Sequence, residues 1–438
     1  MVEERLLGHV RLGGDLGDRC LLVALLGEQP EGRVAVLAAP EGSASLAAPY
    51  DFSFVPVYDG MNEIMDDPEV RAAMETNFRG LRGKRMALQL IRRTGPMLRR
   101  MLDEFAAVPA ADADVVVHPV NLPMQHLAEK LGRPAVGVGL QPGWVPTSSF
   151  PNPLLPFPVP RALNRASYRL PNPALMGLAG VAKQWRSETL GLPRRPNQGD
   201  PLRTPTGAPV TMLQAFSEQV LPGPLAFPSW THTTGYWYLP ASSGWTPPEP
   251  LRAFLDTGEP TVSIGFGSMS GTDPGRVGRT IVEAVRLAGV RAVVITGWGG
   301  IDTSPAGDRI MIIDQAPHDW LFARTAANVH HGGGGTTAAA LAAGRPQVIC
   351  PFIADQPYWG QRMTISGVAP APVPQRRLTA ESLAGALRQA VGDASLAARA
   401  DELGRIIRAE NGVDRAVGLI HEVVRQRAGS GPGPQSRS

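Results

Sequence analysis

The chain has 438 residues, of which 43% are hydrophobic and 18% are charged, and its formal net charge at pH 7 is +3. This length predicts two domains, because one hydrophobic core seldom serves so many residues. The small net charge gives no sign of a nucleic-acid partner. The two cysteines, Cys20 and Cys350, lie far apart and outside any C-x-x-C pattern. Their placement argues against a zinc site or a disulfide framework and is typical of a reducing compartment.

The start of the chain lacks the pattern of a secretory signal, and no uncharged apolar window of about 18 residues occurs. We therefore expect a cytoplasmic protein without a transmembrane segment, for which peripheral contact with a membrane stays open. The last residues, 428–438, have the sequence AGSGPGPQSRS. They hold no core-forming side chain and predict a disordered tail.

The first 60 residues predict one unit of a doubly wound α/β sheet. Residues 5–12 form a weak first strand, because charged side chains interrupt it, and a glycine turn at 13–18 follows. Residues 20–26 are helix-like, 33–39 form a clear second strand, and 52–57 form a third. Strand, glycine turn, helix and strand in this order are typical of half of a doubly wound sheet.

The rest of the first domain continues this alternation up to residue 225. Its predicted elements are a helical region at 68–105, strands at 114–118, 134–140 and 210–216, and a helix at 125–131. His118 ends a strand, where ligands gather in open α/β sheets, although a structural role explains a histidine there equally well. A stiff, proline-rich loop at 141–160 can border an apolar ligand. We place the hinge near residues 222–230 and the second domain at 226–427.

The second domain predicts a second α/β sheet. Its strands are expected at 261–266, 291–296 and 310–313, and its helices at 276–287, 380–391, 396–409 and 412–427. Two aromatic or polar positions follow predicted strands. Trp298 stands in a glycine turn after residue 296, where it can cover a nucleotide base or pack plainly. Ser268 stands at a strand-to-helix turn, where it can donate to a phosphate or cap the helix.

A glycine turn at 329–337, with the sequence VHHGGGGTT, is the strongest indication of a ligand site. A buried strand leads into it, and an alanine-rich run with high helix propensity follows. Glycine lets a backbone approach a ligand closely, and the start of a helix attracts anions such as phosphate. The residues expected to bind phosphate are Ser268, His331, Gly333, Gly334, Gly335 and Thr336.

Several spaced segments resemble GT-B glycosyltransferases, and most closely their sterol glucosyltransferase and antibiotic glycosyltransferase branch. The donor motif is matched by H-H-G-G-x-G-T-T at 330–337, G-x-P at 344–346 and D-Q-P at 355–357. Further similar segments are T-x-x-F-P-x-P at 147–153, G-F-G-S-M at 265–269 and PHDWLF at 317–322. The resemblance implies two Rossmann-like domains that face a cleft, with the helix at 412–427 crossing back to the first domain.

The same resemblance implies an inverting, metal-independent hexosyl transfer. The donor would be a UDP- or dTDP-sugar, and the acceptor a hydroxyl of a sterol, polyketide or other lipophilic natural product. No cofactor is expected, because the nucleotide-sugar is a co-substrate. The nucleoside would lie against Trp298, Gln315 and Ala316. Asp355 and Gln356 would hold sugar hydroxyls, which a carboxylate and an amide complement.

The first glycine turn departs from the G-S-R-G-D-V-Q-P motif of that branch. Gly14, Gly17 and Asp18 match it, whereas Asp15 replaces the serine and Leu16 replaces the arginine. Asp18 stands where the family has its aspartate and is the general base that the resemblance implies. Asp15 is the alternative base, because two carboxylates on one turn repel each other and one can have a raised pKa.

Two other functions stay open from the sequence. The altered first turn favours a donor-binding, catalytically impaired helper of a partner glycosyltransferase, whereas the complete donor motif disfavours it. A sugar-nucleotide epimerase with the same fold is a third hypothesis, against which the apolar loop at 150–160 argues. The sugar, the base of the nucleotide, the acceptor and the oligomeric state are not determined by the sequence.

Overall fold

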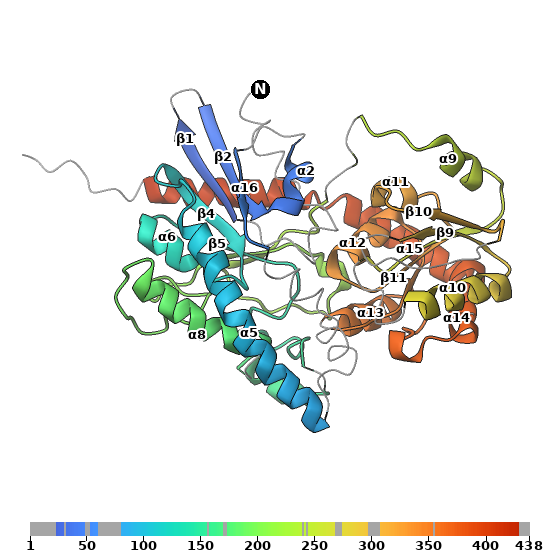
Figure 1. Ribbon diagram of the computed structural model, residues 1–438, viewed down its shortest axis with the longest axis horizontal. Helices are drawn as coiled ribbons and strands as arrows, with labels where there is room; N and C mark the ends of the chain where they lie inside the picture. The colour runs from blue at the N-terminus through green and yellow to red at the C-terminus, as the bar shows by residue number, and fades with distance from the viewer. Residues whose placement is uncertain are drawn as a thin grey trace, which may run out of the picture.

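The computed structural model describes residues 23–29, 32–48, 53–59, 80–155, 157–169, 173–238, 241, 244–267, 274–296, 307–353 and 355–428. These residues form two α/β lobes, each built on its own sheet (Figure 1). Among the helices of these ranges, none combines the length and the hydropathy that crossing a membrane requires. The predicted strand at 5–12 and turn at 13–18 lie outside the described residues.

The N-terminal lobe contains a seven-stranded sheet with the order β3-β2-β1-β4-β5-β6-β7. Its strands are β1 (Val23–Gln29), β2 (Gly32–Pro40), β3 (Ser53–Val57), β4 (Ala113–Pro119), β5 (Ala135–Gly139), β6 (Thr211–Gln214) and β7 (Thr231–Thr233). Strand β1 is antiparallel to both of its neighbours, and all other pairs are parallel. Because β7 pairs with β6, this sheet continues past residue 225, where the sequence predicts the end of the first domain.

The helix predicted at 20–26 is wrong for the described residues 23–26, which belong to β1. Their sequence Val-Ala-Leu-Leu is a short apolar run, and such a run has no periodicity that separates a helix from a buried strand. The reversal of β1 changes the edge at which the chain enters the sheet. Val23 pairs with Ala38, and Ala24 pairs with Val117. The first described residues of β1 therefore lie at the carboxyl ends of the parallel strands.

Two layers of helices cover the faces of this sheet. Side chains alternate between the faces along a strand, and β4 shows this clearly. Val116 packs with Leu102 and Phe105 of α5 (Gly80–Ala106) and with Trp185 of α8 (Pro173–Glu188). Val115 and Val117 pack on the opposite face with Ala416 and Ile420 of α16 (Gly412–Ala428). The C-terminal helix thus crosses back to the first lobe, as predicted (Figure 1).

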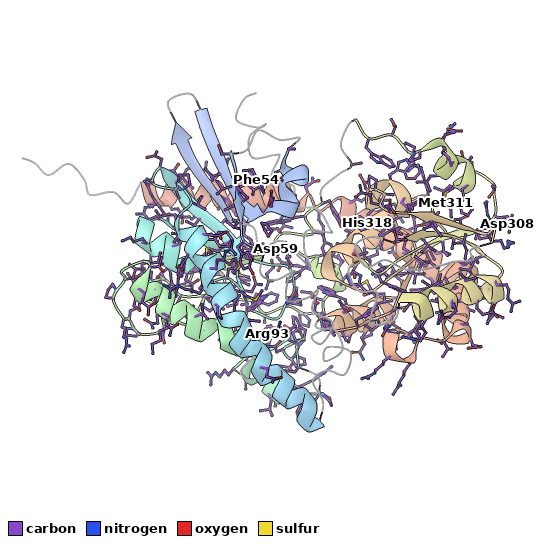
Figure 2. The ribbon with its side chains drawn as sticks, in the orientation of Figure 1. Phe54, Asp59, Arg93, Asp308, Met311 and His318 are labelled. Carbon is purple, nitrogen blue, oxygen red and sulfur yellow. The ribbon has the colours of Figure 1, made fainter. Side chains whose placement is uncertain are left out.

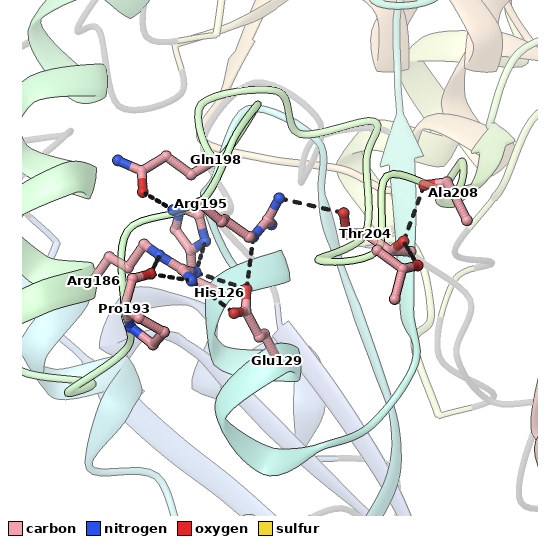
Figure 3. Close-up of polar contacts among 9 residues, drawn as sticks. His126, Glu129, Arg186, Pro193, Arg195, Gln198, Thr204 and Ala208 are labelled. Atoms are coloured by element: carbon pink, nitrogen blue, oxygen red, sulfur yellow. Dashed lines mark hydrogen bonds and ion pairs between the residues drawn. The ribbon is translucent and has the colours of Figure 1, made fainter.

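The loop that follows α8 is fixed to this lobe by a buried ion cluster (Figure 3). Arg186 of α8 donates two hydrogen bonds, of 2.6 and 2.7 Å, to Glu129 of α6 (Gln125–Leu131). Arg195 of the loop donates to the same carboxylate at 3.1 Å. Burial alone would raise the pKa of Glu129, but the two arginines lower it overall. The loop is therefore a structured part of the lobe.

The C-terminal lobe contains five parallel strands with the order β10-β9-β8-β11-β12. They are β8 (Thr261–Gly265), β9 (Arg291–Ile295), β10 (Ile310–Ile313), β11 (Ala327–His330) and β12 (Gln347–Ile349). The helices are α9 (Glu249–Leu255), α10 (Pro274–Ala288), α11 (His318–Phe322), α12 (Gly334–Ala343), α13 (Gln356–Ile365), α14 (Ala380–Gly392) and α15 (Ala394–Arg408). The strands predicted from the sequence are confirmed here, so both lobes have the predicted α/β class.

The carboxyl ends of these five strands point toward the N-terminal lobe. Figure 2 shows Asp308, before β10, on the outer side of the lobe and His318, after β10, on the side nearer the other lobe. A shared hydrophobic core joins the two lobes. Phe150, Phe216 and Val220 contribute to it from the first lobe, and Leu341 and Trp359 from the second.

Candidate active site

The predicted glycine turn connects β11 to α12 at the edge of the C-terminal sheet that faces the other lobe. Gly332 has a φ of +89°, and a Cβ there would lie 2.7 Å from Cγ2 of Ile349. Only glycine fits this conformation and this space. Gly333 caps α12 without any side-chain hydrogen bond. The first amide groups of the helix therefore point toward the space beyond the turn, which is an arrangement that binds anions.

The two histidines of the motif are held in different ways. His330 is 1% exposed; its Nε2 lies 2.9 Å from Oε1 of Gln347, and its Nδ1 accepts a hydrogen bond of 3.0 Å from the Gly332 amide. This pattern assigns a neutral imidazole with the proton on Nε2. Because both ring nitrogens are engaged, His330 shapes the turn. The predicted phosphate donor, His331, lies against the turn after β8, with Cε1 3.7 Å from the position of a Cβ on Gly267.

The remaining predicted phosphate ligands lie in or beside this turn. Gly334, Gly335 and Thr336 form the first turn of α12, and Thr336 is buried. A Cβ on Gly334 would lie 3.4 Å from the carbonyl oxygen of Leu140, which follows β5 in the N-terminal lobe. The start of α12 therefore faces the other lobe directly. Ser268 lies outside the described residues.

The predicted sugar ligands, Asp355 and Gln356, lie at the start of α13 and are both buried. Oε1 of Gln356 accepts hydrogen bonds of 2.8 and 3.1 Å from the amides of Phe352 and Ile353. The amide group of Gln356 can consequently offer only N–H donors to a ligand. Oδ2 of Asp355 accepts a hydrogen bond of 2.9 Å from Nε1 of Trp359. Asp355 offers acceptors, so the pair presents complementary groups to an array of hydroxyls.

Gln315 and Ala316, predicted to contact the nucleoside, follow β10 at the same edge of the sheet. Gln315 is exposed and Ala316 is half-buried, and neither belongs to a helix or strand. Their backbone is therefore open to a ligand. Trp298, the third residue predicted to contact the nucleoside, lies outside the described residues, as do both predicted bases, Asp15 and Asp18. The parts of the donor site that the structure describes come together at one edge.

His118 ends β4 in the N-terminal lobe and has the structural role that the sequence left open. Its side chain is 1% exposed, and its Nδ1 lies 2.9 Å from the carbonyl oxygen of Pro119. Burial lowers the pKa of His118 to about 4. The group is therefore a neutral imidazole that holds the end of the strand.

Two residues at the site were not predicted from the sequence. Gln347 fixes His330 from the neighbouring strand β12, a contact that requires knowledge of the strand order. Trp359 could have been found, because it stands four residues after Asp355 and such residues are neighbours on a helix. Within the described ranges, no group of three histidine, cysteine, aspartate or glutamate side chains is placed to hold a metal ion.

Sequence comparison agrees with the geometry of this site. The family model described as "Erythromycin biosynthesis protein CIII-like, C-terminal domain" matches residues 284–414, which include the glycine turn and Asp355. A sterol 3-beta-glucosyltransferase of Emericella nidulans is 36% identical over 71% of this chain and 23% of its own length. The sterol 3-beta-glucosyltransferase UGT80A2 of Arabidopsis thaliana is 34% identical over 70% of this chain and 48% of its own. The chain thus spans less than half the length of these relatives.

Solved structures with the same architecture include glycosyltransferases. The spinosyn forosaminyltransferase SpnP aligns with a TM-score of 0.60 and 16% identity, over 88% of this chain and 90% of its own. The glycosyltransferase VinC in complex with DTDP aligns with a TM-score of 0.59 and 19% identity, over 89% and 92%. The chain therefore has the GT-B fold, and its resemblance to the sterol and antibiotic branch of the GT-B glycosyltransferases is confirmed.

Proposed function

We propose that the chain is an inverting glycosyltransferase that moves a sugar from a UDP- or dTDP-linked donor to a hydroxyl of a lipophilic acceptor. One observation carries this proposal. The glycine turn and the uncapped start of α12 lie at the sheet edge that faces the other lobe, a geometry that supports an anion site there. The named activity of the sterol relatives suggests a sterol, polyketide or similar natural product as the acceptor, and VinC with DTDP suggests the class of donor. We expect the protein to act in the cytoplasm.

In the proposed reaction, the acceptor hydroxyl attacks the anomeric carbon while the bond from that carbon to the diphosphate oxygen breaks. Asp18, or Asp15 in its place, takes the hydroxyl proton. The charge that develops on the diphosphate is stabilised by the amides of Gly333 to Thr336 and by His331. No metal ion is needed for this stabilisation. Asp355 accepts from the sugar hydroxyls, and Gln356 donates to a sugar oxygen.

A helper function is the second candidate, and the reversed strand β1 favours it. The altered glycine motif precedes β1 in the sequence, and β1 begins at the edge of the sheet where the first strand of a Rossmann-like unit would end. A protein that binds the donor but has lost its base would activate a partner transferase without transferring sugar itself. The two functions differ in what the purified chain does alone.

The purified chain, given UDP-glucose or dTDP-glucose and a panel of sterols and polyketide alcohols, should release nucleoside diphosphate and form glycosides. In calorimetry, His331→Ala should weaken binding of UDP or dTDP by at least about 10-fold, as expected for a lost hydrogen bond to a charged phosphate. His232→Ala on β7 is the matched control and should change neither the affinity for UDP nor the affinity for dTDP. Binding without transfer would favour the helper, and unchanged affinity in His331→Ala would remove that residue from the phosphate site.

A further inference from the structure

Trp359 is a side chain beside the donor site to which the proposed function gives no role. It is fully buried, and its Nε1 donates a hydrogen bond of 2.9 Å to Oδ2 of Asp355. The backbone repeats this link, since the amide of Trp359 donates to the carbonyl oxygen of Asp355 at 3.0 Å. Long side chains on a helix point back toward its N-terminus. The indole therefore returns over the first turn of α13 to the carboxylate one turn earlier.

The hydrogen bond to Trp359 replaces the one that Asp355 would ordinarily make. Asp355 occupies the N-cap position of α13, where an aspartate side chain usually accepts from the amides of the first turn. Its side chain makes no such capping bond. Losing a cap costs a helix about 1 kcal/mol, and a hydrogen bond from the buried indole to a charged carboxylate, worth about 1.5–3 kcal/mol, offsets that cost. The indole therefore helps to hold the carboxylate away from the amides of the first turn.

The indole itself is held by groups from both lobes. Phe216, which follows β6 in the N-terminal lobe, packs edge-on against it, with ring centroids 6.4 Å apart and planes at 62°. On another side, a Cβ at Gly334 would lie 3.5 Å from Nε1 of Trp359. Trp359 thus lies between the glycine turn, which is expected to bind the diphosphate, and Asp355, which is expected to bind the sugar. The diphosphate and the sugar are adjacent in a nucleotide-sugar.

We propose that Trp359 is a positioning residue that orients the carboxylate of Asp355 toward the donor sugar, and that Phe216 holds the indole in place from the opposite lobe. This inference rests on the proposed function, because it takes Asp355 as a sugar ligand. It connects the contact between the lobes, which Phe216 and Trp359 make, to the binding of the sugar by Asp355. A bound nucleoside diphosphate, which has no sugar beyond its phosphates, should be insensitive to this link.

Calorimetry on the full chain can separate positioning from a merely structural role. Trp359→Phe keeps a ring but removes the N–H donor. It should weaken UDP-glucose or dTDP-glucose by about 10-fold, as expected for a lost hydrogen bond to a charged group. Binding of UDP or dTDP should change by less than about twofold, because the glycine turn remains intact. In transfer assays, kcat/KM for the donor should fall by a similar factor.

Trp185→Phe is the matched control. Trp185 is also fully buried, belongs to the core of the N-terminal lobe, and has an Nε1 without a hydrogen-bond partner. The same truncation there should leave the ratio of the two dissociation constants unchanged. A double variant completes the test. If Trp359 acts through Asp355, adding Trp359→Phe to Asp355→Ala should cost no further affinity for the nucleotide-sugar.

The outcomes distinguish this inference from the function beneath it. A wild-type chain that binds neither nucleotide nor nucleotide-sugar would overturn both. If Asp355→Ala loses the sugar selectively while Trp359→Phe weakens both ligands equally, or adds to Asp355→Ala, only the inference fails. Should Trp359→Phe not fold, Phe216→Leu keeps the indole donor and loosens its packing. A smaller loss confined to the nucleotide-sugar would then support the link, and an equal loss for both ligands would overturn it.

Discussion

The two sheets of this protein differ in the direction of one inner strand. In the C-terminal lobe every strand is parallel, so the chain leaves each strand at the same edge, where the glycine turn, Gln315 and Asp355 gather. In the N-terminal lobe the inner strand β1 is antiparallel to both neighbours. The chain therefore enters β1 at the edge where a Rossmann-like unit would have it leave. All five strands of the C-terminal sheet share one direction, whereas the N-terminal sheet reverses one inner strand.

This difference coincides with the departure in sequence. The segment before β1 contains the altered glycine motif, in which Asp15 and Leu16 replace a serine and an arginine, whereas the motif after β11 matches the family throughout. In the proposed function, donor binding and proton removal would therefore rest on lobes that follow the family pattern to different extents.

The largest expected effect tests the N-terminal lobe. Asp18→Asn should lower kcat by roughly 100-fold or more, the contribution of a general base, and should leave both substrates bound, because the amide has nearly the same shape but cannot accept the proton. Steady-state kinetics together with calorimetry would measure both. Wild-type rates in this variant, with activity lost in Asp15→Ser for every donor, would assign the base to Asp15 instead.

Asp15→Ser sharpens the same comparison, because it restores the residue that the family has at this position. With a neutral sugar donor, activity should persist. With an aminosugar donor, activity should fall, because a nearby carboxylate favours an amine by charge attraction. Comparing kcat/KM for the two donors in both proteins measures this preference. An equal effect on both donors would show that Asp15 has no contact with the sugar.

A variant of the glycine turn tests the C-terminal lobe, because this turn has no space for a side chain at Gly332. Gly332→Ala places a Cβ 2.7 Å from Ile349 in a residue with a φ of +89°. It should cost roughly 2–5 kcal/mol from backbone strain and overpacking together, and nucleotide binding should be lost. Gly132→Ala, at a φ of +63° with open space around it, should cost only about 1–2 kcal/mol. Similar losses of stability in thermal unfolding would contradict the special role of Gly332.

The sequence predicted the C-terminal lobe well for a physical reason. All of its strands except the edge strand β10 are almost completely buried, so they appear as apolar runs separated by glycine turns and amphipathic helices. The donor motif is also local: His331 directly follows β11, and Asp355 stands at the start of α13. What the sequence could not supply were contacts that depend on strand order or on the other lobe. The pair His330 and Gln347 is one example, and the packing of Phe216 on Trp359 is another.

The N-terminal lobe was predicted less well, because its first apolar run is ambiguous. Four apolar residues at the start of β1 support either a helix or a buried strand. The glycine turn before them suggested a helix, since that order is usual in this fold. The antiparallel pairing with β2 and β4 is a tertiary property, which no local pattern contains. Strands β4 and β5 were found correctly from their valine-rich runs, and β6 from a short apolar run.

Two histidines predict acid sensitivity of the N-terminal lobe. Burial lowers the pKa of His118 to about 4, and burial with the charge of Arg186 lowers that of His126 to about 4. The unfolded chain binds these protons near pH 6.5, so stability falls as the pH drops from 6.5 toward 4. Each group can cost on the order of 3 kcal/mol over that range. In denaturant unfolding at several pH values, the free energy of unfolding of His118→Gln should depend less steeply on pH than that of the wild type. An unchanged dependence on pH would contradict the low pKa assigned to His118.

The smallest effect concerns the junction that both lobes share. Glu410 lies between α15 and α16, where Ser217 of the N-terminal lobe donates a hydrogen bond of 2.5 Å to its Oε1. Burial raises the pKa of Glu410, although Ser217 and Arg415 oppose the shift. The folded chain therefore keeps this proton to a higher pH than the unfolded chain, and stability falls as the pH rises above about 4.5.

Glu410→Gln can still accept from Ser217 and loses only the charge. It should be more stable than the wild type at pH 7 and equal to it below pH 4, as measured by thermal unfolding. Glu402→Gln, on the exposed face of α15 beside Arg399, should show no such crossover. A loss of stability at pH 7 in Glu410→Gln would mean that the charged carboxylate holds the lobes together.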